Sequence, residues 1–235
     1  MKRIVFFIAI IAMCLSSCGK EINDTNEEKG ESTEIVSENA TINGEQDIDK
    51  DFDKVAVIKH SDDFGLKMYE FNLENSIDQA DQIVKAHVTD TSYYLDEDYP
   101  HTILTITIDE SLYGDLKRGD VVTVHELGGL FTYDDYLDYF GINPDKFEYQ
   151  NVDMIKELYY QKDLHNIGDE AIICLRNADE GFSNVVDYTM PCSSVSFLQY
   201  YEDMDSYMLI GTDGKEDTYY TYDEIIEQIA EFKDK

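Results

Sequence analysis

Two apolar stretches joined by a polar turn constrain the fold of this chain more than any other feature. Within residues 102–112 the apolar Leu104, Ile106 and Ile108 alternate with polar residues. Alternation with a period of two is typical of a β-strand with one buried face. A polar segment bounded by glycines, 114–120, leads to a second apolar stretch at 121–124. The pattern therefore predicts an antiparallel hairpin that ends at the glycine pair 128–129.

Further short apolar stretches predict strands on both sides of this hairpin. They lie at 55–58, 82–90, 170–176, 194–201, 207–211 and 217–220. In the second of them Val84, Ala86 and Val88 share one face. A short helix capped by Ser76 is expected just before it. The fold class predicted is mainly β with some α.

Two segments carry helical periodicity instead. Residues of about 130–165 place Tyr133, Tyr136 and Leu137, and later Met154, Ile155 and Leu158, at helical spacing, which predicts a helical insertion between strands. At the end of the chain, Thr221 and Glu224 form the pattern of a capping box. An apolar stripe follows at Ile225, Ile226, Ile229 and Phe232, so a C-terminal helix is expected.

The N-terminus has the layout of an export signal. Lys2 and Arg3 precede an apolar run from Ile4 to Leu15, which is too short to span a bilayer comfortably. The run closes on Leu15-Ser16-Ser17-Cys18, which resembles the lipobox of bacterial lipoproteins. The resemblance implies that residues 1–17 are removed and that Cys18 receives a palmitate-bearing diacylglycerol. The alternative is an ordinary signal peptide with a chance cysteine.

This interpretation divides the chain into three parts. Residues 1–17 are the signal peptide, and residues 18–53 are the lipidated cysteine with a disordered acidic tether, because that stretch has no sustained apolar period. Residues 54–235 form a single β-rich globular domain. We expect the protein to be extracytoplasmic and anchored to the cell membrane, or to the outer membrane where the bacterium has one.

The charge balance limits the partners. The chain has 51 acidic and 18 basic residues, a formal net charge of −33, which argues against nucleic-acid binding and against docking on anionic lipid headgroups. There are 18 tyrosines and no tryptophan. Tyrosine side chains are common both where an element is packed but partly exposed and on binding surfaces, so the excess fits either packing or a tyrosine-lined binding face. Outside the signal and Cys18 only Cys174 and Cys192 remain, and they are either free thiols or a disulfide.

Part of the domain resembles a group of uncharacterised bacterial lipoproteins that carry a small β-barrel. The resemblance covers residues 76–129 and 167–176. It rests on Ala80 to Val84, on Thr105 to Leu112 with Gly114, on Leu116 to Val124 with Gly128-Gly129, and on Gly168 to Leu175. This order is similar to OB-like barrels, an architecture that the tissue inhibitors of metalloproteinases share. The resemblance implies an antiparallel, OB-like, partly open β-barrel, and it carries fold rather than activity.

Catalytic signatures are absent from the sequence, which has no nucleophile elbow, zinc-protease motif or phosphate-binding loop. We therefore expect no catalytic, cofactor-binding or metal-binding residues and no cofactor. If the hairpin pairs Tyr113 with Val121, Asp109 lies opposite His125. Such a pair either orients an imidazole for proton transfer or is an ordinary cross-strand surface contact.

These observations favour a binding or interaction module of the cell envelope, with a protein, peptide or glycan as ligand. An envelope enzyme that uses carboxylates for acid/base chemistry, or a cation-assisted hydrolase, is the alternative. That enzyme would need two carboxylates that converge in one pocket. A purely structural lipoprotein is the third possibility.

Overall fold

The predicted hairpin lies at the centre of the observed fold. The structure is a computed structural model that describes residues 34–36, 54–60, 72–96, 99–159, 163–179, 181–211 and 216–233. The hairpin strands are β4 (Tyr99–Tyr113) and β5 (Val121–Thr132). Leu104, Ile106 and Ile108 are buried as the alternation predicts. Both strands are longer than predicted, and β5 continues through Gly128 and Gly129 because both glycines pair with a further strand.

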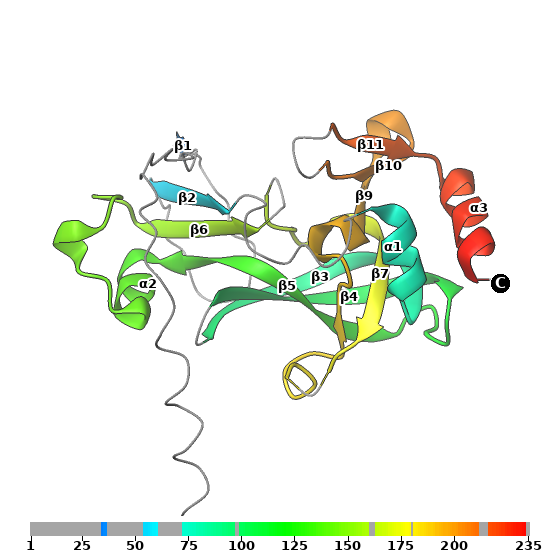
Figure 1. Ribbon diagram of the computed structural model, residues 1–235, viewed down its shortest axis with the longest axis horizontal. Coiled ribbons are helices and arrows are strands. Elements are labelled where there is room, and N and C mark those ends of the chain that lie inside the picture. Colours follow the sequence, from blue (N-terminus) through cyan, green and yellow to red (C-terminus); the bar gives the residue numbers. More distant parts are fainter. Residues whose placement is uncertain are drawn as a thin grey trace, which may run out of the picture. The chain divides into compact units, whose positions relative to one another are not determined.

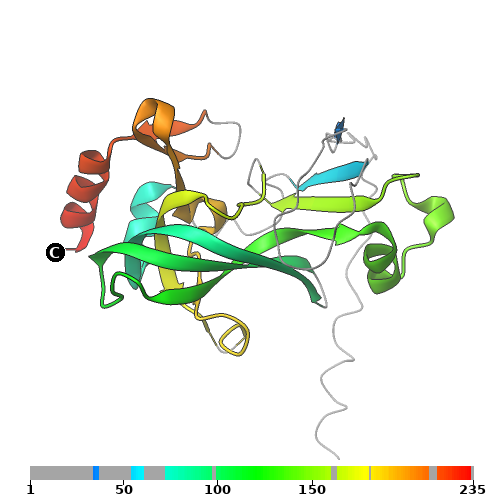
Figure 2. The same ribbon diagram turned by 180° about the vertical axis from the view of Figure 1, so that it is seen from behind.

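Eleven strands among the described residues are hydrogen-bonded into one mixed sheet. Besides β4 and β5 they are β1 (Glu34–Val36), β2 (Val55–His60), β3 (Gln82–Asp96), β6 (Met154–Tyr159), β7 (Glu170–Asn177), β8 (Tyr188–Thr189), β9 (Phe197–Tyr201), β10 (Ser206–Leu209) and β11 (Thr218–Tyr220). Ten of them follow the order β1-β2-β6-β5-β4-β3-β7-β9-β10-β11, and β8 pairs with both β5 and β7. The pairs β2–β6 and β5–β8 are parallel. The long strands β3, β4 and β5 are visible in Figures 1 and 2.

Five strands form a partial ring around the main core. The ring runs β3, β4, β5, β8 and β7, and the two residues of β8 complete it. Alternate side chains of these strands point inward and are buried together: Val84, Ala86, Val88, Leu104, Ile106, Ile108, Val122, Val124, Ala171, Ile173 and Leu175. Burial of this apolar surface is the main stabilising contribution to the ring. The prediction of a mainly β fold with some α is confirmed.

Three α-helices flank the sheet among the described residues. They are α1 (Leu73–Gln79), α2 (Tyr133–Phe140) and α3 (Tyr222–Lys233), and single 3-10 turns lie at Pro144–Lys146, Ser193–Ser196 and Glu202–Met204. Helices α1 and α3 lie side by side and bury Ile77, Ile225 and Ile229 in a second apolar cluster (Figure 1). The expected C-terminal helix and its capping box are confirmed, because Thr221 N donates to Glu224 over 2.8 Å and Glu224 N donates to Thr221 over 3.3 Å.

The expectation that Ser76 caps α1 is wrong. The helix begins one turn earlier, where the side chain of Asn72 accepts from Asn75 N over 2.8 Å. Ser76 lies inside the helix, and its hydroxyl donates to the carbonyl oxygen of Asn72. Asparagine is one of the strongest N-cap residues, and it precedes the apolar Leu73 that the helix buries.

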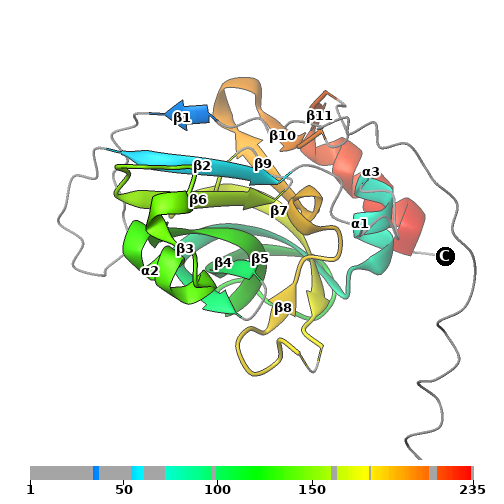
Figure 3. The same ribbon diagram turned by 60° about the vertical axis from the view of Figure 1, so that its left-hand side comes forward.

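The helical insertion of about 130–165 is only partly helical. Helix α2 forms where predicted, but residues 154–159 are strand β6, so the second half of that prediction is wrong. The segment is too short for its apolar period to distinguish a strand from a helix. Pairing decides it, because β6 fills the position between β5 and β2 (Figure 3). Burial on both faces explains why adjacent residues at each end of the strand, Met154 and Ile155, then Leu158 and Tyr159, are apolar or aromatic.

The N-terminal predictions lie mostly outside the described residues. The signal peptide, Cys18 and most of the tether of residues 18–53 belong to this part. Within that stretch the structure describes Glu34–Val36, which pairs with β2 as strand β1. Among the described residues, no helix combines the length and the apolar character that crossing a membrane requires.

Candidate functional site

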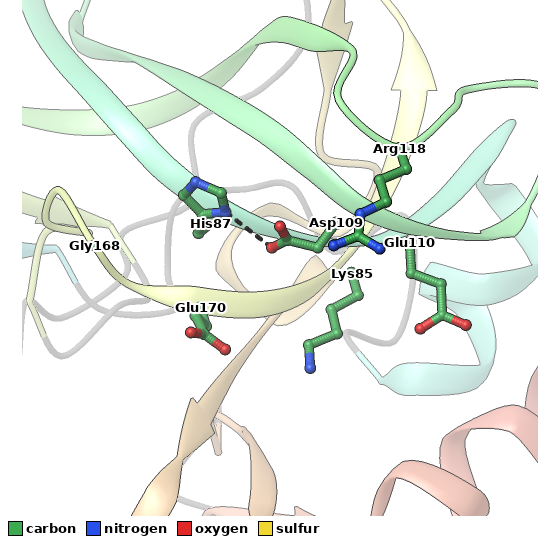
Figure 4. A pocket seen from close by; sticks show the side chains of 7 residues that line it. All are labelled: Lys85, His87, Asp109, Glu110, Arg118, Gly168 and Glu170. Atoms are coloured by element: carbon green, nitrogen blue, oxygen red, sulfur yellow. Dashed lines mark hydrogen bonds and ion pairs between the residues drawn. The ribbon is translucent and has the colours of Figure 1, made fainter.

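A pocket of about 470 Å³ opens on the polar face of β3, β4 and β7 (Figure 4). Because Val84, Ala86 and Val88 of β3 face the core, their neighbours Lys85 and His87 point to the other face. The lining residues are Lys85, His87, Asp109, Glu110, Arg118, Gly168 and Glu170. We call this the charged pocket. Its lining combines three carboxylates with a lysine, an arginine and a histidine.

A histidine–carboxylate contact lies in the charged pocket. His87 Nδ1 is 2.9 Å from Asp109 Oδ2, and each of the two side chains is 36% exposed. The strand register explains the contact. Lys85 pairs with Glu110 and Ala86 pairs with Ile108, so Asp109 is the extra residue of a β-bulge. A bulge re-aims the side chain of the extra residue, and here it brings Asp109 to His87.

The predicted pairing of Asp109 with His125 is therefore wrong. His125 lies opposite Ile103, and β4 and β5 stop pairing at Thr107 and Val121. The prediction assumed that the whole of β4 pairs with β5. In the structure the ladder between β4 and β5 ends at Thr107 and Val121, six positions before Tyr113, and the residues of β4 beyond it pair with β3 alone.

His125 has a buried partner of its own. Its Nε2 lies 2.7 Å from Nδ1 of His101, and both residues are at most 8% exposed. The rings of Tyr94 and Phe182 cover the two imidazoles. Burial, and then the nearby His101, lower the pKa of His125 to about 4. The His125 ring is therefore neutral at neutral pH, and one of the two nitrogens donates to the other.

Tyrosines border the charged pocket on the side of β9 and β10. The Lys85 ammonium lies 5.8 Å from the ring centroid of Tyr200, within the range of a cation–π contact. Tyr200 also donates to Asp205 over 3.0 Å, and its ring is 5.2 Å from that of Tyr207. Part of the tyrosine excess thus lies beside charged groups.

A buried carboxylate that the sequence did not reveal lies on β6. Glu157 is 2% exposed and accepts hydrogen bonds from His60 over 3.0 Å, from Tyr159 over 2.8 Å and from Tyr136. Burial alone would raise the pKa of Glu157, but the three donors outweigh that effect and lower it. Burial, together with this carboxylate, raises the pKa of both tyrosines. These contacts join β2, β6 and α2.

The two remaining cysteines are free thiols in the structure. Cys174 and Cys192 are both buried in the cluster that α1 and α3 cover. Burial raises the pKa of the Cys174 thiol to about 12 and also raises that of Cys192. Neither thiol has the low pKa and exposure of a reactive cysteine. Within the part of the chain that the structure describes, no group of three or more metal-binding side chains could hold a metal ion.

No model of a known protein family matches the sequence, and no curated protein is significantly similar to it.

Proposed function

We propose that the chain is a lipid-anchored, extracytoplasmic binding module of the cell envelope. The observation that carries the proposal is the charged pocket, in which side chains of both signs surround the His87–Asp109 contact. Such a lining suits a ligand that itself carries both charges, such as a peptide with free ends. None of its described lining residues has a hydroxyl or a thiol, so the pocket offers no nucleophile of those kinds.

We also propose that the five-strand ring is an OB-like, partly open barrel. That architecture is a five-stranded Greek-key barrel with incomplete closure. In support, the ring is completed only by the two residues of β8, through one parallel and one antiparallel pairing. The charged pocket would then lie on the outer face of β3, β4 and β7.

The anchor is tested by replacing its sulfur. We expect Cys18→Ser to abolish incorporation of radiolabelled palmitate and to move the protein from the detergent phase to the aqueous phase, because the lipid is attached through the thiol. Cys14→Ser is the matched control, since that cysteine lies within the signal. Unchanged labelling and partitioning of Cys18→Ser would contradict the anchor.

The binding role is tested with small probes on the full-length chain in detergent micelles. We expect triglycine to shift the amide NMR signals of the charged pocket and its acetylated, amidated form to do so much less. Glu170→Gln should weaken triglycine binding by about fivefold, which corresponds to one partly exposed ion pair. Glu227→Gln on α3 is the control. If neither triglycine nor a disaccharide shifts these signals, the charged pocket is not the binding site.

An envelope enzyme is the second candidate, either a carboxylate acid/base enzyme or a cation-assisted hydrolase. The His87–Asp109 contact favours it, because a carboxylate can orient an imidazole for proton transfer, and Glu170 lines the same pocket. Hydrolysis of a peptide or glycoside that His87→Gln abolishes would favour the enzyme. A chain with neither binding nor hydrolysis would fit the purely structural lipoprotein.

A further inference from the structure

A second cavity, of about 240 Å³, lies beside the segment 163–169 that leads into β7. We call it the acidic cavity. One part of its lining is apolar and comes from Leu164, Phe197, Met208 and Ile210. The other part is polar and comes from Asp163, His165, Asn166, Asp169, Gln199 and Tyr201. The cavity thus joins an apolar wall to two carboxylates.

A buried ion pair lies at the edge of the acidic cavity. His165 Nδ1 is 2.8 Å from Glu126 Oε1, and the two side chains are 9% and 1% exposed. No other described residue donates a hydrogen bond to either oxygen of Glu126. The His165 ring is stacked on Phe197, with 3.7 Å between ring centroids. Glu126 is buried against the His165 ring, so its carboxylate balances the charge of a protonated His165. Asp163 and Asp169 therefore set the sign of the charge in the cavity.

Hydrogen bonds orient the two carboxylates of the cavity. Asp163 accepts from Leu164 N over 2.8 Å and from Lys156 Nζ over 3.0 Å. Asp169 accepts from Asn166 N over 2.8 Å. The segment is fixed to β3, because Val88 exchanges backbone hydrogen bonds of 3.0 and 2.8 Å with Asp169 and Gly168. These bonds use one oxygen of each carboxylate, and Asp163 is 58% exposed although it is paired with Lys156.

We propose that the acidic cavity binds an organic cation, namely an ammonium or guanidinium group on a short apolar stem. The cationic group would contact Asp163 and Asp169, and the stem would pack on Phe197 and Met208. At about 240 Å³ the cavity is smaller than the pockets of about 300–1,000 Å³ that hold drug-sized ligands. Its volume therefore suits a ligand of side-chain size. The net charge of −33 also attracts cations to the surface. This proposal does not depend on the ligand of the charged pocket.

The test uses two probes of nearly equal shape on the full-length chain in detergent micelles. We expect N-acetylarginine amide to shift the amide NMR signals of Asn166 and Gln199, and the neutral N-acetylcitrulline amide to leave them unchanged. Agmatine distinguishes the source of the cation. Equal affinity for agmatine assigns the cavity to free cations, and tighter binding of N-acetylarginine amide assigns it to peptide side chains.

Two variants that each remove one negative charge distinguish the effect of the Asp169 carboxylate from the effect of the net charge of the protein. Asp169→Asn keeps an oxygen that can accept from Asn166 N but removes the negative charge, and it should weaken binding by about fivefold. Asp78→Asn, on the exposed face of α1, should leave the affinity unchanged. The proposal is overturned if neither arginine probe binds, if the citrulline probe binds equally well, or if the two variants behave alike.

Discussion

Glu157→Ala should lower the free energy of unfolding by about 3–5 kcal/mol, the cost of removing one partner from a buried charged network. Glu157 is 2% exposed, and its carboxylate accepts from His60, Tyr136 and Tyr159. The alanine would leave these donors without their acceptor and would open a cavity between β6 and α2. Urea unfolding, followed by circular dichroism, measures the change.

Two further variants test whether the loss of stability comes from the hydrogen-bonding network around Glu157. Glu157→Gln keeps the shape and one acceptor oxygen, so it should cost less, about 1–3 kcal/mol. Glu148→Ala removes an exposed carboxylate from the connection that precedes β6 and should change stability by less than about 0.5 kcal/mol. Unfolding of Glu157→Ala and Glu148→Ala at the same urea concentration would contradict the structural role of Glu157.

Acidification should destabilise the fold through His125 well before the carboxylates titrate. The pKa of His125 is 6.5 in the unfolded chain and about 4 in the folded protein, because burial and His101 disfavour the charged ring. A lowered folded pKa contributes stability that is complete above pH 6.5 and is lost as the pH falls toward 4. The total loss should be roughly 3 kcal/mol.

The measurement is the urea midpoint across this pH window, compared between variants. His125→Gln removes the titrating ring and should flatten the curve between pH 6.5 and pH 4. Val121→Thr changes a 61% exposed residue at the start of the same strand and adds no titrating group, so it should keep the slope of the unmodified protein. Protonation of Glu157 begins to matter only below pH 4.5, because its folded pKa is lowered from that value. Parallel curves for His125→Gln and the unmodified protein would disprove the assignment.

The strand faces could be predicted because alternation is a local property. Val84, Ala86 and Val88 were assigned to the buried face from sequence alone, and so was the apolar face of β4. The capping box of α3 was equally local, since its two residues are three positions apart. Features that depend only on residues close together in the chain, such as strand faces and helix caps, could therefore be predicted from the sequence.

The candidate sites depended on contacts between distant residues, which leave no local pattern. The bulge at Asp109 follows from pairing of β4 with β3, so the hairpin alone predicted the wrong histidine. Glu126 and His165 are 39 positions apart in the sequence, and nothing near either marks them as partners. The one available signal was Glu126 itself, the single Asp, Glu, Lys or Arg between Val121 and Thr132.

Closure of the ring by β8 makes one seam much weaker than the rest. There β5 and β7 are connected through the two residues of β8 and through Asp187, which bonds to Thr123 and Ala178, whereas β3 and β4 are paired along nearly their whole length. Proteins open first where few backbone hydrogen bonds must break. Amide protons along this seam should therefore exchange with solvent while the β3–β4 ladder stays protected, which gives the domain a built-in route for transient opening of its core.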